Sequence, residues 1–140
     1  MTTLEQITEY VWANQPRRRD VPKEKLARWV NWHMAQGWIA VANCRNEICG
    51  CCVVRPIMDV MDAFAALEYD QEGKGLYIAE AIATEPGALM MLGFVMLKRF
   101  GPNRFEYVCW HRKDKKLQVH SAHSLRRNLF RMKLERALVK

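Results

Sequence analysis

The sequence predicts an α/β domain. Its 140 residues suffice for one domain with a single hydrophobic core, and half of them are apolar. Segments with helical apolar spacing alternate with segments that resemble strands. One apolar helix, expected at 86–100, lies between the strand-like segments 76–84 and 104–112, and a helical crossover of this kind joins parallel neighbours. We therefore expect the order α-α-β-β-β-β-α-β-β-α in a single domain covering residues 1–140.

Two helices are expected first. Thr3 and Gln6 have the spacing of a capping box, which opens a helix that continues to about Asn14. The segment 15–20 breaks this helix. Pro22 suits the first position of a second helix, which we expect to end at Gly37.

Strand patterns follow the helices. The segments 38–44 and 47–55 flank Arg45-Asn46, which predicts a β-hairpin. We expect Pro56 to end the second strand, and a third strand at 63–69.

The remaining elements follow from the same patterns. We expect strand 76–84, helix 86–100, strands 104–112 and 116–120, and a basic helix at 124–139. The helix 86–100 is apolar on nearly every side, which is typical of a buried helix. Ser124 is a suitable cap for the last helix.

The net charge of +7 is concentrated at one end. Residues 1–110 hold 12 basic and 13 acidic side chains, whereas residues 111–140 hold 10 basic and 2 acidic ones. The basic end favours an acidic partner, either nucleic acid or an acidic protein, although a helix with a solvated basic face explains it equally. The residues expected to contact such a partner are Arg112, Lys115, Lys116, Arg126, Arg127 and Arg131.

Composition also bears on location. The longest nearly unbroken apolar stretch, 88–97, is ten residues long and too short to span a bilayer. The polar, acidic start does not resemble a secretory signal. We expect a cytoplasmic protein without a membrane partner.

The five cysteines admit two interpretations. Cys44, Cys49, Cys51 and Cys52 fall on the expected hairpin and Cys109 on a later strand, with His111, His120 and His123 nearby. The spacing Cys49-Gly50-Cys51-Cys52 lacks the usual zinc knuckle, so we expect no metal and cysteines packed as small apolar residues. An odd number of cysteines without a signal segment predicts reduced thiols.

The stretch 76–89 (LYIAEAIATEPGAL), with its helix ending in Lys98-Arg99-Phe100-Gly101, resembles the core strand, turn and helix of the GNAT-type N-acyltransferase fold. It is most similar to the toxin-activating lysine-acyltransferase branch, in which a strand with an acidic residue leads into a "G-A-L" helix. The resemblance implies a mixed sheet of six or seven strands with helices on both faces.

The resemblance also implies a function. An acyl group would pass from a thioester donor, acyl-CoA or an acyl-carrier protein, to an amine, with no cofactor held permanently. The donor would lie along the strand and the helix start, contacting Ile82, Ala83, Thr84, Gly87 and Ala88.

Glu80 is the candidate base. Its neighbours on the same strand face, Ile78 and Ile82, are apolar, and a buried carboxylate is suited to remove a proton from an amine. Alternatively, Glu80 pairs with an arginine. His120 is a second candidate base, or simply part of a solvated strand end.

Two departures from the family keep a second hypothesis open. The turn 84–88 lacks the basic residue of the usual phosphate loop, and Arg17-Arg18-Arg19 stands where the lysine acyltransferases have their catalytic His. The alternative is a non-catalytic interaction protein of this fold, of the kind found as bacteriophage or virion components, or one that binds nucleic acid through its basic end.

Overall fold

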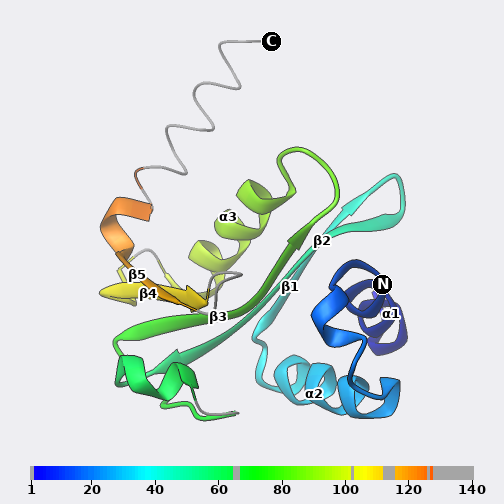
Figure 1. The fold of residues 1–140 in the computed structure, drawn as a ribbon. Coiled ribbons are helices and arrows are strands. Elements are labelled where there is room, and N and C mark those ends of the chain that lie inside the picture. Colours follow the sequence, from blue (N-terminus) through cyan, green and yellow to red (C-terminus); the bar gives the residue numbers. More distant parts are fainter. Residues whose placement is uncertain (1, 65–66, 102, 112–115, 126, 128–140) are drawn as a thin grey trace, which may run out of the picture. The chain divides into compact units, whose positions relative to one another are not determined.

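The computed structural model describes residues 2–64, 67–101, 103–111, 116–125 and 127 (Figure 1). The elements follow in this order: α1 (Leu4–Asn14), the 3₁₀ helix η1 (Pro16–Arg18), α2 (Lys23–Gln36), β1 (Ile39–Cys44), β2 (Glu47–Ile57), the 3₁₀ helix η2 (Val60–Phe64), β3 (Gly75–Ala83), α3 (Ala88–Phe100), β4 (Tyr107–His111) and β5 (Leu117–Ser121). The strands form one sheet in the order β1-β2-β3-β4-β5. The expected mixed α/β fold is confirmed, with five strands in the described part of the chain instead of six or seven.

The chain divides into two compact units. The first consists of Met1–Val53 and Glu80–Leu92, and the second of Val54–Ala79 and Gly93–Lys140. The elements β2, β3 and α3 each contribute residues to both units.

The two N-terminal helices of the first unit agree closely with the prediction. The Thr3 side chain accepts a hydrogen bond from the backbone N–H of Gln6, and the Gln6 side chain accepts one from the N–H of Thr3. This capping box satisfies N–H groups that the first turn of α1 leaves unpaired. Pro22 is the cap of α2 and not its first helical residue. Gly37 ends α2 with a left-handed φ of 79°, which glycine adopts without a steric cost.

The predicted hairpin is present, with one irregularity. Arg45 and Asn46 both have positive φ, as the two central residues of a type I′ turn require. The ladder pairs Ala42 with Gly50 and Asn43 with Ile48, so that Cys49 is an extra residue in β2. Such a β-bulge redirects a side chain and sharpens the local twist.

The strand β2 extends further than expected. Pro56 does not end it, since the strand continues to Ile57. Proline removes one N–H donor but keeps its carbonyl, and the Pro56 carbonyl accepts the N–H of Asp70.

Helices cover both faces of the sheet in the first unit. Gly50 faces α3 so closely that an ideal Cβ on it would lie 3.0 Å from the Cβ of Ala88 and 3.2 Å from Cδ1 of Leu92. Cys51, the next residue along β2, points to the opposite face. Its thiol is electrostatically coupled to Glu80, whose side chain is bound by residues that follow α1.

The second unit contains the parallel pair that the crossover predicts. Gly75–Ile78 of β3 pairs with Tyr107–Trp110 of β4 in parallel, and β5 pairs with β4 in antiparallel fashion. The strand expected at 104–112 begins only at Tyr107. Gly75 leaves room for the ring of Tyr107, which an ideal Cβ at this position would overlap.

The strand expected at 63–69 is not formed in the part that the structure describes. Val60–Phe64 is a 3₁₀ helix, and Leu67 has a positive φ, which is incompatible with a strand. The Asp59 carboxylate accepts the N–H of Met61, and the Asp62 carboxylate accepts the N–H of Asp59. These local side-chain bonds favour a tight turn over extended backbone.

The helix α3 is not buried on every side, so this expectation was wrong. Ala88, Leu92 and Met96 are buried, whereas Leu89 and Met91 are 53% and 47% exposed. The helix also begins at Ala88 and not at Pro86, because Gly87 has a left-handed φ of 84°.

Most of the helix expected at 124–139 lies outside the described residues. Residues 122–125 have helical backbone, and the Ser121 hydroxyl accepts the N–H of Ser124. Ser121 therefore caps this turn, and Ser124 is a residue within it. Among the described residues, no helix has the length and apolar character needed to cross a membrane.

Candidate functional site

Glu80 lies in the first unit and is only 3% exposed. Its Oε1 accepts a hydrogen bond of 2.7 Å from the Gln15 side-chain amide. Its Oε2 accepts bonds of 3.0 Å from Arg17 and 3.1 Å from Arg18, and both are also ion pairs. The alternative in which Glu80 pairs with an arginine is therefore present in the structure. The role of base remains a prediction.

The short segment after α1 builds this arrangement. Gln15 has extended backbone. Pro16 starts a single 3₁₀ turn, which places Arg17 and Arg18 next to Gln15. The Arg18 guanidinium also lies over the Trp29 ring, 4.3 Å from its centroid. Arg19 turns back and donates to the carbonyls of Trp12 and Ala13 at the end of α1.

The two arginines differ in their access to solvent. The Arg18 side chain is 24% exposed and is enclosed between Glu80 and Trp29, whereas the Arg17 side chain is 51% exposed. Of the two arginines, Arg17 is thus the one that an incoming molecule reaches more easily. The sequence pattern indicated only a helix break at Gln15, Arg17 and Arg18. One local signal could have indicated Arg17 and Arg18 as site residues: they occupy the position at which the lysine acyltransferases that the sequence resembles have their catalytic His.

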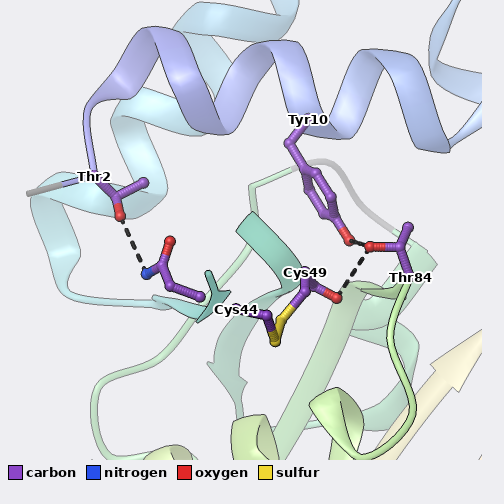
Figure 2. The surroundings of a disulfide bond; sticks show 6 residues. Thr2, Tyr10, Cys44, Cys49 and Thr84 are labelled. Atoms are coloured by element: carbon purple, nitrogen blue, oxygen red, sulfur yellow. Dashed lines mark hydrogen bonds between the residues drawn. A yellow bond between two sulfur atoms is a disulfide. The ribbon is translucent and has the colours of Figure 1, made fainter. Parts of the chain in front are cut away.

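The turn between β3 and α3 is fixed by Thr84. Its N–H and its hydroxyl both donate to the Cys49 carbonyl, at 2.9 and 3.3 Å. The Tyr10 hydroxyl of α1 lies 3.1 Å from the Thr84 hydroxyl oxygen. Figure 2 shows this chain of bonds from α1 through Thr84 to β2. The sequence did not indicate Tyr10.

The residues predicted to contact an acyl donor are brought together at this turn. Ala83 and Thr84 are exposed, and Ile82 and Ala88 are buried. Since the Thr84 N–H points toward β2 and successive peptide groups alternate along a strand, the Ala83 backbone points away from β2. The Ala88 N–H donates to the Glu85 carbonyl, and the Gly87 carbonyl accepts the N–H of Met91.

The cysteines do not all conform to the expectation of reduced thiols. Cys44 and Cys49 form a disulfide across the bulge of the hairpin, which corrects it (Figure 2). The bulge redirects the Cys49 side chain, which spacing alone did not reveal. Cys51, Cys52 and Cys109 are buried free thiols, as packing in the core predicts. Burial raises the pKa of Cys51 to about 12 and that of Cys109 to about 11.

No group of three or more His, Cys, Asp or Glu side chains in the described segments is arranged to hold a metal ion.

His120 lies in the second unit, so it is described apart from Glu80. It is exposed on β5 and stacks on Trp110, with ring centroids 4.7 Å apart. The same unit contains a polar pair that the sequence did not indicate. The Tyr77 hydroxyl lies 2.9 Å from Nδ1 of His111, and the Arg55 guanidinium lies 4.9 Å from the Tyr77 ring centroid.

Of the six basic residues expected to bind a partner, the structure describes two. Lys116 and Arg127 are exposed. Arg112, Lys115, Arg126 and Arg131 lie outside the described residues.

No protein-family model matches the chain, and no curated protein matches it. Among solved structures, the chain is similar to the GphF GNAT-like decarboxylase in complex with isobutyryl-CoA, at 16% identity and a TM-score of 0.57, covering 76% of this chain and 60% of that one. It is also similar to the loading GNATL domain of CurA from Lyngbya majuscula, at 14% identity and a TM-score of 0.48, covering 65% and 50%. The chain therefore spans about 60% of the length of the decarboxylase structure. The first of these similarities shows that this chain has a GNAT-like fold.

Proposed function

We propose that this chain binds an acyl thioester along the end of β3 and the turn into α3, and transfers the acyl group to an amine. The GNAT-like fold carries this proposal, and the similar decarboxylase was solved with isobutyryl-CoA. The exposed Ala83, whose backbone points away from β2, supports it. A pantetheine amide can pair with such a strand backbone.

The donor proposed is a thioester of phosphopantetheine, carried by CoA or by an acyl-carrier protein. Glu85 is exposed at the turn and repels a pyrophosphate, and the Ala88 N–H is already bonded to the Glu85 carbonyl. Both features weaken the anion site that a helix start otherwise offers. Binding of the pantetheine arm therefore has to contribute most of the affinity.

In the proposed reaction, Glu80 takes a proton from the amine as its nitrogen attacks the thioester carbonyl, and the thiolate leaves. Glu80 has a hydrogen-bond donor on each carboxylate oxygen. The amine therefore has to approach from the side of the half-exposed Arg17 and displace its bond to Glu80.

The contacts of the Glu80 carboxylate also favour a second candidate function. Two arginines and one amide already bind the Glu80 carboxylate, which is the arrangement of a structural ion pair. A non-catalytic protein of this fold, interacting through its basic end, fits these contacts.

Donor binding decides whether the first proposal holds. Thermal unfolding is measured with acetyl-CoA, isobutyryl-CoA and an acyl-carrier protein loaded with the same acyl groups. We expect a rise in Tm with at least one donor, since a ligand at 100 times its Kd stabilises by about 2.7 kcal/mol. No rise with any of them contradicts the proposal and favours the interaction protein.

Variants at the turn locate the donor. Ala83→Pro removes the backbone N–H, whereas the matched control Ala83→Ser keeps it. We expect the first to abolish the Tm rise and the second to preserve it. Glu85→Gln removes the repelling charge, so we expect it to tighten CoA binding even if Ala83→Pro fails to fold. Equal binding by all three variants rules out this turn as the donor site.

The role of Glu80 is tested by acyl transfer under saturating donor. Glu80→Gln is expected to reduce kcat by about 10²–10⁴-fold while the donor still binds. Arg17→Gln is the control, because it removes an ion pair and keeps the carboxylate. An equal loss of kcat in both variants assigns the effect to the ion pair and not to a base.

A further inference from the structure

The Cys44–Cys49 disulfide lies next to the bonds that fix the β3–α3 turn. Cys49 is the bulge residue of β2, and its carbonyl is the acceptor for both the N–H and the hydroxyl of Thr84. Its side chain is bound to Cys44 at the other side of the Arg45-Asn46 turn. Figure 2 shows the disulfide and the bond from the Thr84 hydroxyl meeting at this one residue.

The disulfide closes a short loop, because its two cysteines are separated by only five positions. A bulge residue is not held by the β1–β2 ladder, so the disulfide is the covalent restraint on Cys49. Opening it leaves the position of the Cys49 carbonyl to weaker interactions. The hold on Thr84, and through Thr84 on Tyr10, weakens with it.

The two cysteine residues differ in exposure. Cys49 is 3% exposed, whereas Cys44 is partly exposed. Thiol–disulfide exchange requires a thiolate to reach a sulfur atom, so the attack falls on Cys44. The neighbouring thiols do not compete, because Cys51 and Cys52 are buried. Burial also raises the pKa of Cys51 to about 12, which keeps it in the unreactive thiol form near neutral pH.

We propose that Cys44–Cys49 is a thiol–disulfide exchange site for a dithiol reductant, and that its redox state sets how firmly Thr84 holds the β3–α3 turn. A thiolate of the dithiol attacks Sγ of Cys44 and forms a mixed disulfide, and the Cys49 sulfur leaves and takes up a proton. The second thiol of the reductant then attacks its own sulfur in the mixed disulfide and releases Cys44. The disulfide is reduced by two electrons, and the dithiol is oxidised to a cyclic disulfide.

The chemical part is tested on the folded full-length chain. Dithiothreitol and glutathione are added to the folded chain in a concentration series. The reaction is quenched with acid, and all free thiols are then alkylated in denaturant and counted by mass spectrometry. We expect three alkylated cysteines in the oxidised chain and five in the reduced chain, with dithiothreitol acting at lower concentrations. A chain already fully reduced after air oxidation, or one reduced only in denaturant, overturns the proposal.

The structural part is read from hydrogen–deuterium exchange at the Thr84 amide. Reduction is expected to speed this exchange by about tenfold, and Cys44→Ser is expected to show the fast rate without reductant. Cys52→Ala is the matched control, since it removes a free thiol and must retain the redox response. The comparison of oxidised with reduced wild-type protein needs no variant, so the test survives if Cys44→Ser fails to fold. Equal exchange in both redox states overturns the proposal.

This inference does not depend on the proposed function, because both measurements omit the acyl donor. A chain that binds no donor but shows the redox response supports the exchange site and contradicts the proposed function. A chain that binds a donor but shows no redox response contradicts the exchange site and leaves the proposed function standing.

Discussion

Gly50 lies at a close approach between β2 and the start of α3 in the first unit. Its hydrogen atom occupies the space in which a Cβ would lie 3.0 Å from that of Ala88. We expect Gly50→Ala to destabilise the protein by about 1–3 kcal/mol through overpacking. Urea unfolding measures the change.

The double variant Gly50→Ala with Ala88→Gly moves the methyl group from one side of this contact to the other. It is expected to recover part of the stability, apart from the lower helix propensity of glycine. If the changes in the free energy of unfolding of the two single variants simply add up in the double variant, the contact between residues 50 and 88 does not limit the packing.

Cys51 predicts how stability responds to alkaline pH. Its pKa is about 12 in the folded chain against an ordinary value of 9.0, so the folded state keeps the proton that the unfolded state releases. Stability from this group is therefore complete below pH 9 and declines as pH rises toward 12. We expect a decrease of about 1.4 kcal/mol between about pH 8 and pH 10 in urea unfolding. Cys51→Ala should lack this component, and an identical pH dependence in both proteins would contradict the assignment.

At the residue scale, the sequence indicated Glu80 and offered an arginine partner as one alternative, but it did not indicate which residues bind the carboxylate. A carboxylate between Ile78 and Ile82 on one strand face is a local signal, and periodicity reveals it. The donors Gln15, Arg17 and Arg18 are more than 60 positions away in the sequence. Only the fold brings them to Glu80, so no spacing within the strand predicts them.

At the scale of elements, the apolar composition of α3 does not predict which of its side chains are buried. Leu89 is 53% exposed and Leu92 is 2% exposed, although they are three residues apart on the same helix. Leu92→Ala is expected to cost about 2–5 kcal/mol and Leu89→Ala less than about 0.5 kcal/mol, measured by chemical denaturation. Similar values for both would mean that the outer face of α3 is covered in solution.

Local chemistry explains which elements the sequence predicted well. The capping box of α1, Gly37 after α2 and the Arg45-Asn46 turn act within a few residues, so pattern analysis locates them. The bulge at Cys49 depends on pairing between strands, and the turn at Val60–Phe64 depends on bonds from Asp59 and Asp62. Neither changes the hydrophobic pattern, so both were missed.

At the scale of the whole molecule, the charge is the feature that a partner recognises from a distance. Residues 128–140 contribute four basic residues and one acidic residue, so removing them lowers the net charge from +7 to +4. If the basic end binds a polyanion, truncation after residue 127 should elute from heparin at lower salt. It should also reduce the slope of log affinity against log salt for DNA by about 0.9 for each phosphate that the chain no longer neutralises.

A full-length chain with Arg131, Lys133, Arg136 and Lys140 replaced by Gln is the matched control. It should behave like the truncated chain. If both variants elute from heparin at the same salt concentration as the wild-type chain, the basic end does not bind a polyanion and its charges only face solvent.

The division into two units has a consequence for synthesis on the ribosome. The first unit needs Glu80–Leu92 in addition to Met1–Val53, so the N-terminal 53 residues emerge before their unit is complete. Until Glu80 follows, Arg17 and Arg18 have no carboxylate from β3, and the Cys49 carbonyl has no Thr84 to bind. About 40 further residues must be synthesised after Val53 before this unit can fold completely, which takes a few seconds at typical translation rates. A fragment ending at Val53 should accordingly remain open to proteolysis.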